Sequence, residues 1–157
     1  DIFAGNYWIR SPERFALPWR LFAINLYSEE PDSAMLGLAV ASGSDTLAVA
    51  QGHRKEARLA IFQRPADPTQ LWQERRLEDG LHLVRPHGLL AAESQGKGEF
   101  AFYVGEHAGA ASRILLVPFD APVREVARGR DVLALWRLES GQLLSVGSDN
   151  VSLWRPK

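Results

Sequence analysis

Apolar residues in this chain occur in short runs of four to eight residues, separated by stretches rich in Gly, Pro, Asp and Ser. Such runs are typical of β-strands, whereas the 3.6-residue spacing of an amphipathic helix is scarce. The pattern therefore predicts an all-β protein. The expected strands are 19–26, 36–41, 46–51, 58–63, 82–85, 88–92, 99–104, 113–118, 132–137, 142–146 and 151–155.

Segment 70–77 fits either a helix or an outer strand. Asp67 and Pro68 before it, and Gly80 after it, are typical of a helix with an N-cap, a proline in the first turn and a glycine at the C-terminus. The repetition of strand hairpins elsewhere in the chain favours a strand. The sequence leaves both interpretations open.

Three segments share one local design: an alternating strand, a glycine, a loop, and a second strand that ends in an aromatic residue near a proline. A further strand precedes each hairpin. The glycines Gly52, Gly105 and Gly147 are 53 and 42 residues apart, which is about the length of a propeller blade. We expect one domain over residues 1–157, with a covering segment and first strand in 1–30 and hairpin units at 36–80, 82–130 and 131–157.

The last unit, Leu-Leu-Ser-Val-Gly-Ser-Asp-Asn-Val-Ser-Leu-Trp at 143–154, resembles the end of a WD40-type blade. Phe62 and Phe119 take the Trp-like position in the other two units, and the Gly-His dipeptide of that family is not found near a blade start. The resemblance spans about 36–155 and implies three to four antiparallel sheets of repeated hairpins. Because a closed propeller has four to eight blades, this length implies an incomplete or miniature propeller-like arrangement.

Composition excludes several classes of function. The chain has 18 Lys and Arg against 19 Asp and Glu, for a net charge of −1. This balance argues against binding to nucleic acid or to an anionic membrane surface. The absence of cysteine excludes disulfides, thiolate metal sites and thiol catalysis. No apolar run approaches the ~20 residues of a transmembrane helix, so no transmembrane segment is expected.

Motifs for catalysis and for cofactor binding are weak. His82 and His87 lack the helical spacing of a zinc site, and Gly96-Lys-Gly98 is too short for a phosphate loop. Ser44-Asp45 and Ser148-Asp149 fit turns better than calcium loops. We therefore expect no catalytic residue, no metal site and no cofactor, and we expect the protein not to be an enzyme.

The chain contains five tryptophans. Trp19, Trp136 and Trp154 are expected in the core between sheets, and Trp8 is expected to be exposed. The alternative is an aromatic binding face for a sugar or a protein.

Two loops are the expected binding surfaces, because 52–57 and 105–112 occupy the same place in the repeat, and a propeller-like arrangement would put both at one end of the molecule. The first loop is charged, whereas the second consists mainly of small residues that can enter a narrow cleft. The candidate partner-binding residues are His53, Arg54, Lys55, Glu106, His107, Gly109 and Ser112.

The expected function is non-enzymatic protein binding. By analogy with small bacterial periplasmic proteins, the chain would be an inhibitor or immunity protein that occludes a partner enzyme, such as a toxin or a cell-wall hydrolase, in the periplasm. Two alternatives stay open. One is a carbohydrate-binding or hydrolytic β domain with an aromatic cleft. The other is a fragment of a larger propeller scaffold, which would associate through uncovered sheets.

Overall fold

The fold is described from a computed structural model. It describes residues 1–4, 6–25, 35–41, 45–51, 57–93 and 100–155. In this part of the chain the regular structure is strand, apart from one short 3₁₀ turn, η1 (Gly109–Ala111). No helix within these residues has the length and apolar character needed to span a membrane. The prediction of an all-β protein is confirmed.

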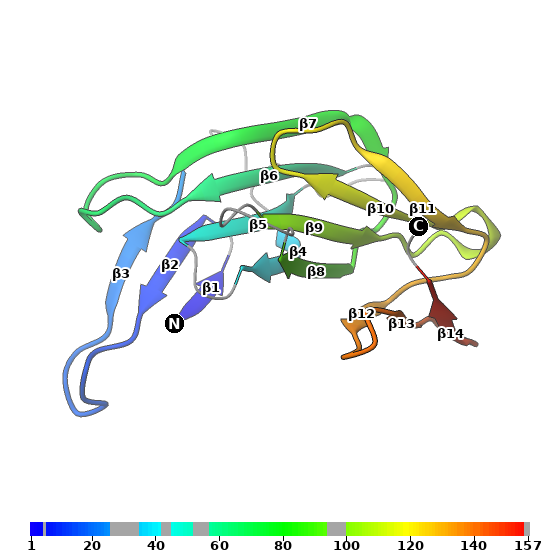
Figure 1. The fold of residues 1–157 in the computed structure, drawn as a ribbon. Coiled ribbons are helices and arrows are strands. Elements are labelled where there is room, and N and C mark those ends of the chain that lie inside the picture. The colour runs from blue at the N-terminus through cyan, green and yellow to red at the C-terminus, as the bar shows by residue number, and fades with distance from the viewer. Residues whose placement is uncertain (5, 26–34, 42–44, 52–56, 94–99, 156–157) are drawn as a thin grey trace.

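Four antiparallel sheets follow one another along the chain, and neighbouring strands in each sheet are neighbours in sequence (Figure 1). The first sheet contains β1 (Ile2–Ala4), β2 (Tyr7–Arg10) and β3 (Arg20–Ala23). The second contains β4 (Met35–Val40), β5 (Thr46–Gln51), β6 (Ala57–Gln63) and β7 (Gln73–Leu83). The third contains β8 (Gly88–Glu93), β9 (Phe100–Gly105), β10 (Arg113–Pro118) and β11 (Arg124–Arg128). The fourth contains β12 (Ala134–Arg137), β13 (Leu143–Val146) and β14 (Val151–Trp154).

The predicted sheets of repeated hairpins are confirmed, and none of the four closes into a barrel. Each of the two middle sheets is a four-stranded meander, with the three strands expected for its repeat unit and one more strand at its outer edge. The outer strands are β7 and β11.

The ambiguous segment 70–77 does not form a helix. From Gln73 it belongs to β7, which pairs antiparallel with β6. The Asp67 side chain closes a turn instead of capping a helix, because its Oδ1 accepts hydrogen bonds from the Thr69 amide at 2.9 Å and the Thr69 hydroxyl at 2.7 Å. Aspartate makes such local bonds both in turns and at helix starts, so the local sequence cannot distinguish the two.

The apolar pattern of the sequence does not predict three of the strands. β1 and β2 contain three and four residues and lie in the segment 1–30, for which the sequence predicts a covering segment and one strand. β11 is an outer strand in which only Val126 and Ala127 are partly buried. A strand that buries little carries a weak apolar signal.

The sheets stack face to face in chain order, with one apolar cluster at each of the three contacts. β5 is buried at all six positions because its alternate side chains enter two clusters. Leu47 and Val49 pack with Trp8 of the first sheet. Ala48 and Ala50 lie in the cluster shared with the third sheet. The second sheet therefore needs a covering sheet on each face.

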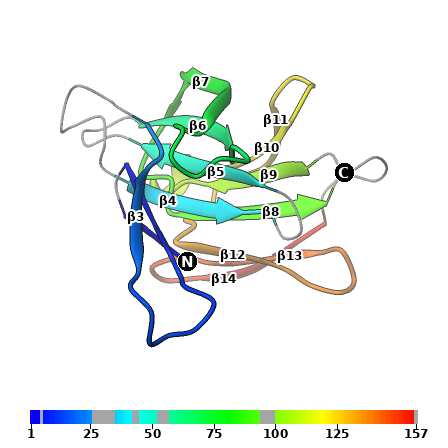
Figure 2. The same cartoon turned by 90° about the vertical axis from the view of Figure 1, so that its left-hand side faces the viewer.

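The first and fourth sheets lie at opposite ends of this row (Figure 1). The first strands of successive sheets meet along one side, since β8 contacts both β4 and β12, and β4 and β8 lie side by side in Figure 2. The result is an open, propeller-like row of four sheets.

The expectations for the tryptophans are wrong in three cases. Trp8 is only 2% exposed, because it faces the second sheet and its ring contacts that of Trp72 edge-on at 5.5 Å. Trp19 and Trp136 are 38% and 48% exposed. Trp154 is partly buried against the third cluster, and its Nε1 donates to Ser145 Oγ at 2.8 Å.

Two glycines set the spacing between the third and fourth sheets. Gly88 and Gly105 are opposite each other on β8 and β9. A Cβ at Gly105 would lie 2.3 Å from Val132 Cγ1, and one at Gly88 would lie 2.8 Å from the same atom. The fully buried Val132 side chain therefore occupies the space that side chains at these positions would need.

We expect Gly105→Ala to lower the free energy of unfolding by about 1–3 kcal/mol, because the added methyl overpacks this contact. Chemical denaturation would measure the loss, and adding Val132→Ala should recover part of it. Gly80→Ala is the matched control, since no atom lies within 4 Å of a Cβ at Gly80. Equal losses for the two alanine variants would contradict this explanation.

Candidate functional site

Three connections meet at one end of the third and fourth sheets: the β9–β10 loop, the link from β11 to β12, and the β13–β14 turn. They enclose an open pocket of about 350 Å³. Its lining residues are Gly109, Ala110, Gly129, Arg130, Asp131, Ser148, Asp149 and Asn150.

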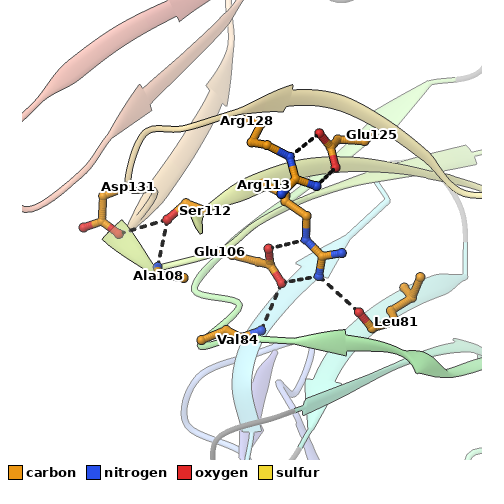
Figure 3. Close-up of polar contacts among 9 residues, drawn as sticks. All are labelled: Leu81, Val84, Glu106, Ala108, Ser112, Arg113, Glu125, Arg128 and Asp131. Atoms are coloured by element: carbon orange, nitrogen blue, oxygen red, sulfur yellow. Dashed lines mark hydrogen bonds and ion pairs between the residues drawn. The ribbon is translucent and has the colours of Figure 1, made fainter. Parts of the chain in front are cut away.

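Asp131 joins these three connections. Its side chain is 5% exposed and accepts hydrogen bonds from the other two segments. From the β9–β10 loop, Oδ2 contacts His107 Nδ1 at 2.6 Å, and Oδ1 accepts from the Gly109 amide at 3.3 Å. Ser112 Oγ lies 3.4 Å from Oδ1. From the β13–β14 turn, the Ser148 amide and hydroxyl donate to Oδ2 at 3.2 and 2.8 Å. Figure 3 shows the contact with Ser112.

The donors around Asp131 stabilise its charged form. Burial raises the pKa of this carboxyl, but the hydrogen bonds from the hydroxyl and amide of Ser148, the Gly109 amide and His107 together lower the pKa from 3.8 to about 2. Asp131 is therefore anionic at neutral pH. A carboxylate held in this way orders the loops and is a poor general acid or base.

A second buried carboxylate, that of Glu106, anchors the start of the β9–β10 loop. Glu106 is 1% exposed, and Arg113 Nε and Nη2 donate to its two oxygens, each at 2.7 Å (Figure 3). The Val84 amide donates to Glu106 Oε1 at 3.0 Å, and Arg113 Nη2 also donates to the Leu81 carbonyl at 3.1 Å. The hydrogen bond to Glu106 raises the pKa of Arg113. This pair connects the end of β7 to the start of the loop.

Among the candidate partner-binding residues, His107, Gly109 and Ser112 bond to Asp131, whereas Glu106 pairs with Arg113. Glu106 and Ser112 are buried, and the Ser112 hydroxyl accepts a hydrogen bond from the Ala108 amide at 2.8 Å. His107 is partly exposed, and Gly109 is exposed with a φ of 59°, a conformation that favours glycine. The remaining candidates, His53, Arg54 and Lys55, lie outside the described residues, so their position relative to the β9–β10 loop stays a prediction.

Sequence reasoning missed Asp131, Arg113 and Ser148. Asp131 comes from a connection that carried no motif, and Arg113 was assigned only to a strand. The sequence around Ser148 predicts a local turn, whereas its hydroxyl donates to Asp131, 17 positions earlier in the chain. The feature of the sequence that could have indicated these residues is a charged or hydroxyl side chain at the end of an expected strand, because loops lie close together there.

The arrangement lacks the geometry of a serine hydrolase. In acyl transfer the imidazole stands between the serine and the carboxylate. Here His107, Ser112 and Ser148 all bond directly to Asp131. Within the described part of the chain, no group of three or more His, Asp or Glu side chains is placed to hold a metal ion. What the site offers to a ligand is an ordered, shallow surface of small residues flanked by Arg130 and Asp149.

Comparisons with protein-family models, with curated proteins and with solved structures found no match.

We expect Asp131→Asn to lower the free energy of unfolding at neutral pH by about 2 kcal/mol. This is the free energy that corresponds to the drop in the Asp131 pKa from 3.8 to about 2 on folding. Because the folded-state pKa lies below the unfolded value of 3.8, this stabilisation is fully present above about pH 5 and is lost as the pH falls through about 2. Denaturation at several pH values should therefore show the wild type and the variant converging in acid.

Asp149→Asn is the matched control on the neighbouring turn, because this carboxylate is exposed. Its effect should stay within about 0.5 kcal/mol. A loss for Asp131→Asn that is the same at all pH values would contradict the charge-based explanation.

For the Glu106–Arg113 pair, we expect Glu106→Gln to cost about 3–5 kcal/mol, because it leaves a partly buried guanidinium without its counter-charge. Glu125→Gln tests the same kind of pair at the surface, where Glu125 bonds to Arg128 (Figure 3). That variant should cost less than about 1 kcal/mol. Thermal or urea unfolding of both variants would compare the pairs, and similar losses would contradict the difference in burial.

Proposed function

We propose that this chain is a non-enzymatic protein-binding domain, and that its partner docks at the end formed by the β9–β10 loop, the β11–β12 link and the β13–β14 turn. The observation that carries the proposal is the network around Asp131. A single buried carboxylate holds three connections in one arrangement. A surface ordered before binding loses little conformational entropy when a partner docks.

The exposed part of this surface suits a protein partner. Gly109, Ala110 and Ala111 are exposed and carry no polar side chain that would have to be desolvated in a narrow cleft. Arg130 and Asp149 lie beside them with opposite charges, which provides rim contacts that orient a partner. A loop of this kind can occlude the active site of an enzyme. By analogy with small bacterial periplasmic inhibitors and immunity proteins, we expect the partner to be a toxin or a cell-wall hydrolase.

The observations favour this function over a carbohydrate-binding cleft. Sugar sites use exposed aromatic faces, and the residues that line the pocket include no aromatic side chain. Trp8 and Trp72 are buried between the first and second sheets. The exposed Trp19 and Trp136 belong to opposite ends of the row of sheets.

Ala110→Trp tests the proposal, because it places a large side chain on the exposed loop without disturbing the Asp131 network. We expect it to weaken partner binding at least 100-fold while the melting temperature stays unchanged. The matched control is Ala121→Trp, an exposed alanine in the connection at the other end of β10. The experiment isolates proteins from bacterial extracts that bind the wild type and Ala121→Trp but not Ala110→Trp. Calorimetry then measures their affinities for the three proteins.

A panel of cell-wall hydrolases assayed with and without the protein would test inhibition directly. A partner that binds all three proteins equally would contradict docking at this loop. Saturable binding of an oligosaccharide, lost in Ala110→Trp, would favour the carbohydrate alternative.

A further inference from the structure

In the described part of the chain, exposed apolar side chains are concentrated in the two terminal sheets and the connections next to them. Thirteen large hydrophobic residues are exposed in the described part of the chain. Six of them lie within residues 1–23 and five within residues 131–155; among the residues of the two middle sheets and their connections whose burial is described, Val40 and Leu71 are the two exposed ones. A soluble monomer rarely gathers its exposed apolar groups in this way.

The outer face of the fourth sheet is apolar at every position. Alternate residues of its strands face the third sheet, including Leu135 and Leu143. The opposite positions are paired across the strands and form the outer face, which consists of Ala134, Trp136, Leu144, Val146, Val151 and Leu153. Trp136, Val151 and Leu153 are each about half exposed or more.

The first sheet has the same property at the other end of the row. Phe3, Trp8 and Phe22 face the second sheet. The opposite face carries Ile2, Ala4, Tyr7, Ile9, Leu21 and Ala23. Ile2, Tyr7 and Leu21 are at least half exposed.

The two uncovered faces are of opposite kinds in the stacking order. In the second sheet, Leu47 and Val49 face the preceding sheet, and Ala48 and Ala50 face the following sheet. The outer face of the first sheet thus corresponds to the face that packs against the preceding sheet in the rest of the row. The outer face of the fourth sheet corresponds to the face that packs against the following sheet. Bringing these two faces together continues the mode of stacking that the three internal contacts already use.

We propose that two copies of this chain associate head to tail, with the outer face of the fourth sheet of each copy against the outer face of the first sheet of the other. Two copies of four sheets make a ring of eight, which is within the four to eight of closed propellers. The two contacts of this dimer are related by a two-fold axis, so the arrangement closes after two copies and covers both apolar faces of each copy. This association does not depend on the proposed loop site, which lies on other residues.

The first experiment is sedimentation velocity on the whole chain over a range of concentrations. We expect a species of twice the chain mass of 17.5 kDa that dissociates on dilution. A monomer at all concentrations up to about 100 μM would overturn the proposal, because a stable interface of standard size supports micromolar or tighter association.

Charged substitutions then locate the contact. Leu153→Lys on the fourth sheet and Leu21→Lys on the first should each raise the dissociation constant of the dimer at least tenfold, since each places an ammonium group in both contacts of the ring. Val151→Lys and Ile2→Lys are second variants of the two faces. Leu71→Lys is the matched control, an exposed leucine between β6 and β7, and should leave the constant unchanged. Circular dichroism would verify that each variant is folded.

Mixing the two variants distinguishes the head-to-tail arrangement from pairing of like faces. In a mixture of Leu21→Lys and Leu153→Lys, one of the two contacts contains only unaltered faces. The mixture should therefore form heterodimers at concentrations where each variant alone is monomeric. A dimer that is weakened by only one of the two substitutions, or a mixture that stays monomeric, would overturn the head-to-tail arrangement.

Discussion

The burial of both faces of the second and third sheets is the constraint on which the rest of the structure depends. β5 has no exposed position, and β9 and β10 send alternate side chains to the second and the fourth sheet. A sheet with two apolar faces is stable only when another sheet packs on each face, because both faces must be removed from contact with water. The two three-stranded sheets supply this cover. Each of them then has one apolar face that no other part of the described chain covers.

The close packing of the fourth sheet against the third positions the residues of the candidate site. Gly88 and Gly105 leave room for Val132, and the Val132 amide donates to the Glu106 carbonyl at 3.0 Å. Asp131, one residue earlier, is thereby positioned among the donors of the β9–β10 loop and the β13–β14 turn. The same contact of Val132 with the third sheet thus stacks the sheets and orders the loops. Loops ordered in this way can act as a recognition surface.

Much of the candidate loop was predictable, but the groups that order it were not. Glu106, His107, Gly109 and Ser112 lie in one loop of mainly small residues that follows an expected strand, and the repeat pattern is enough to select them. Asp131 and Ser148 stand 19 and 36 positions beyond Ser112 in the chain. Their importance depends on which connections meet in space. A lone aspartate after Gly-Arg and a serine in a turn carry no local sign of that meeting.

The amino-acid sequence by itself determined the all-β class, the positions of most strands and the repetition of hairpins. Apolar alternation and turn residues act over a few positions, so they can be interpreted locally. Only the tertiary structure decided that 73–83 is a strand, that Trp8 is buried while Trp136 is exposed, and which apolar faces stay uncovered. A strand presents two faces with the same periodicity, and which of them meets another sheet depends on contacts between residues far apart in the chain.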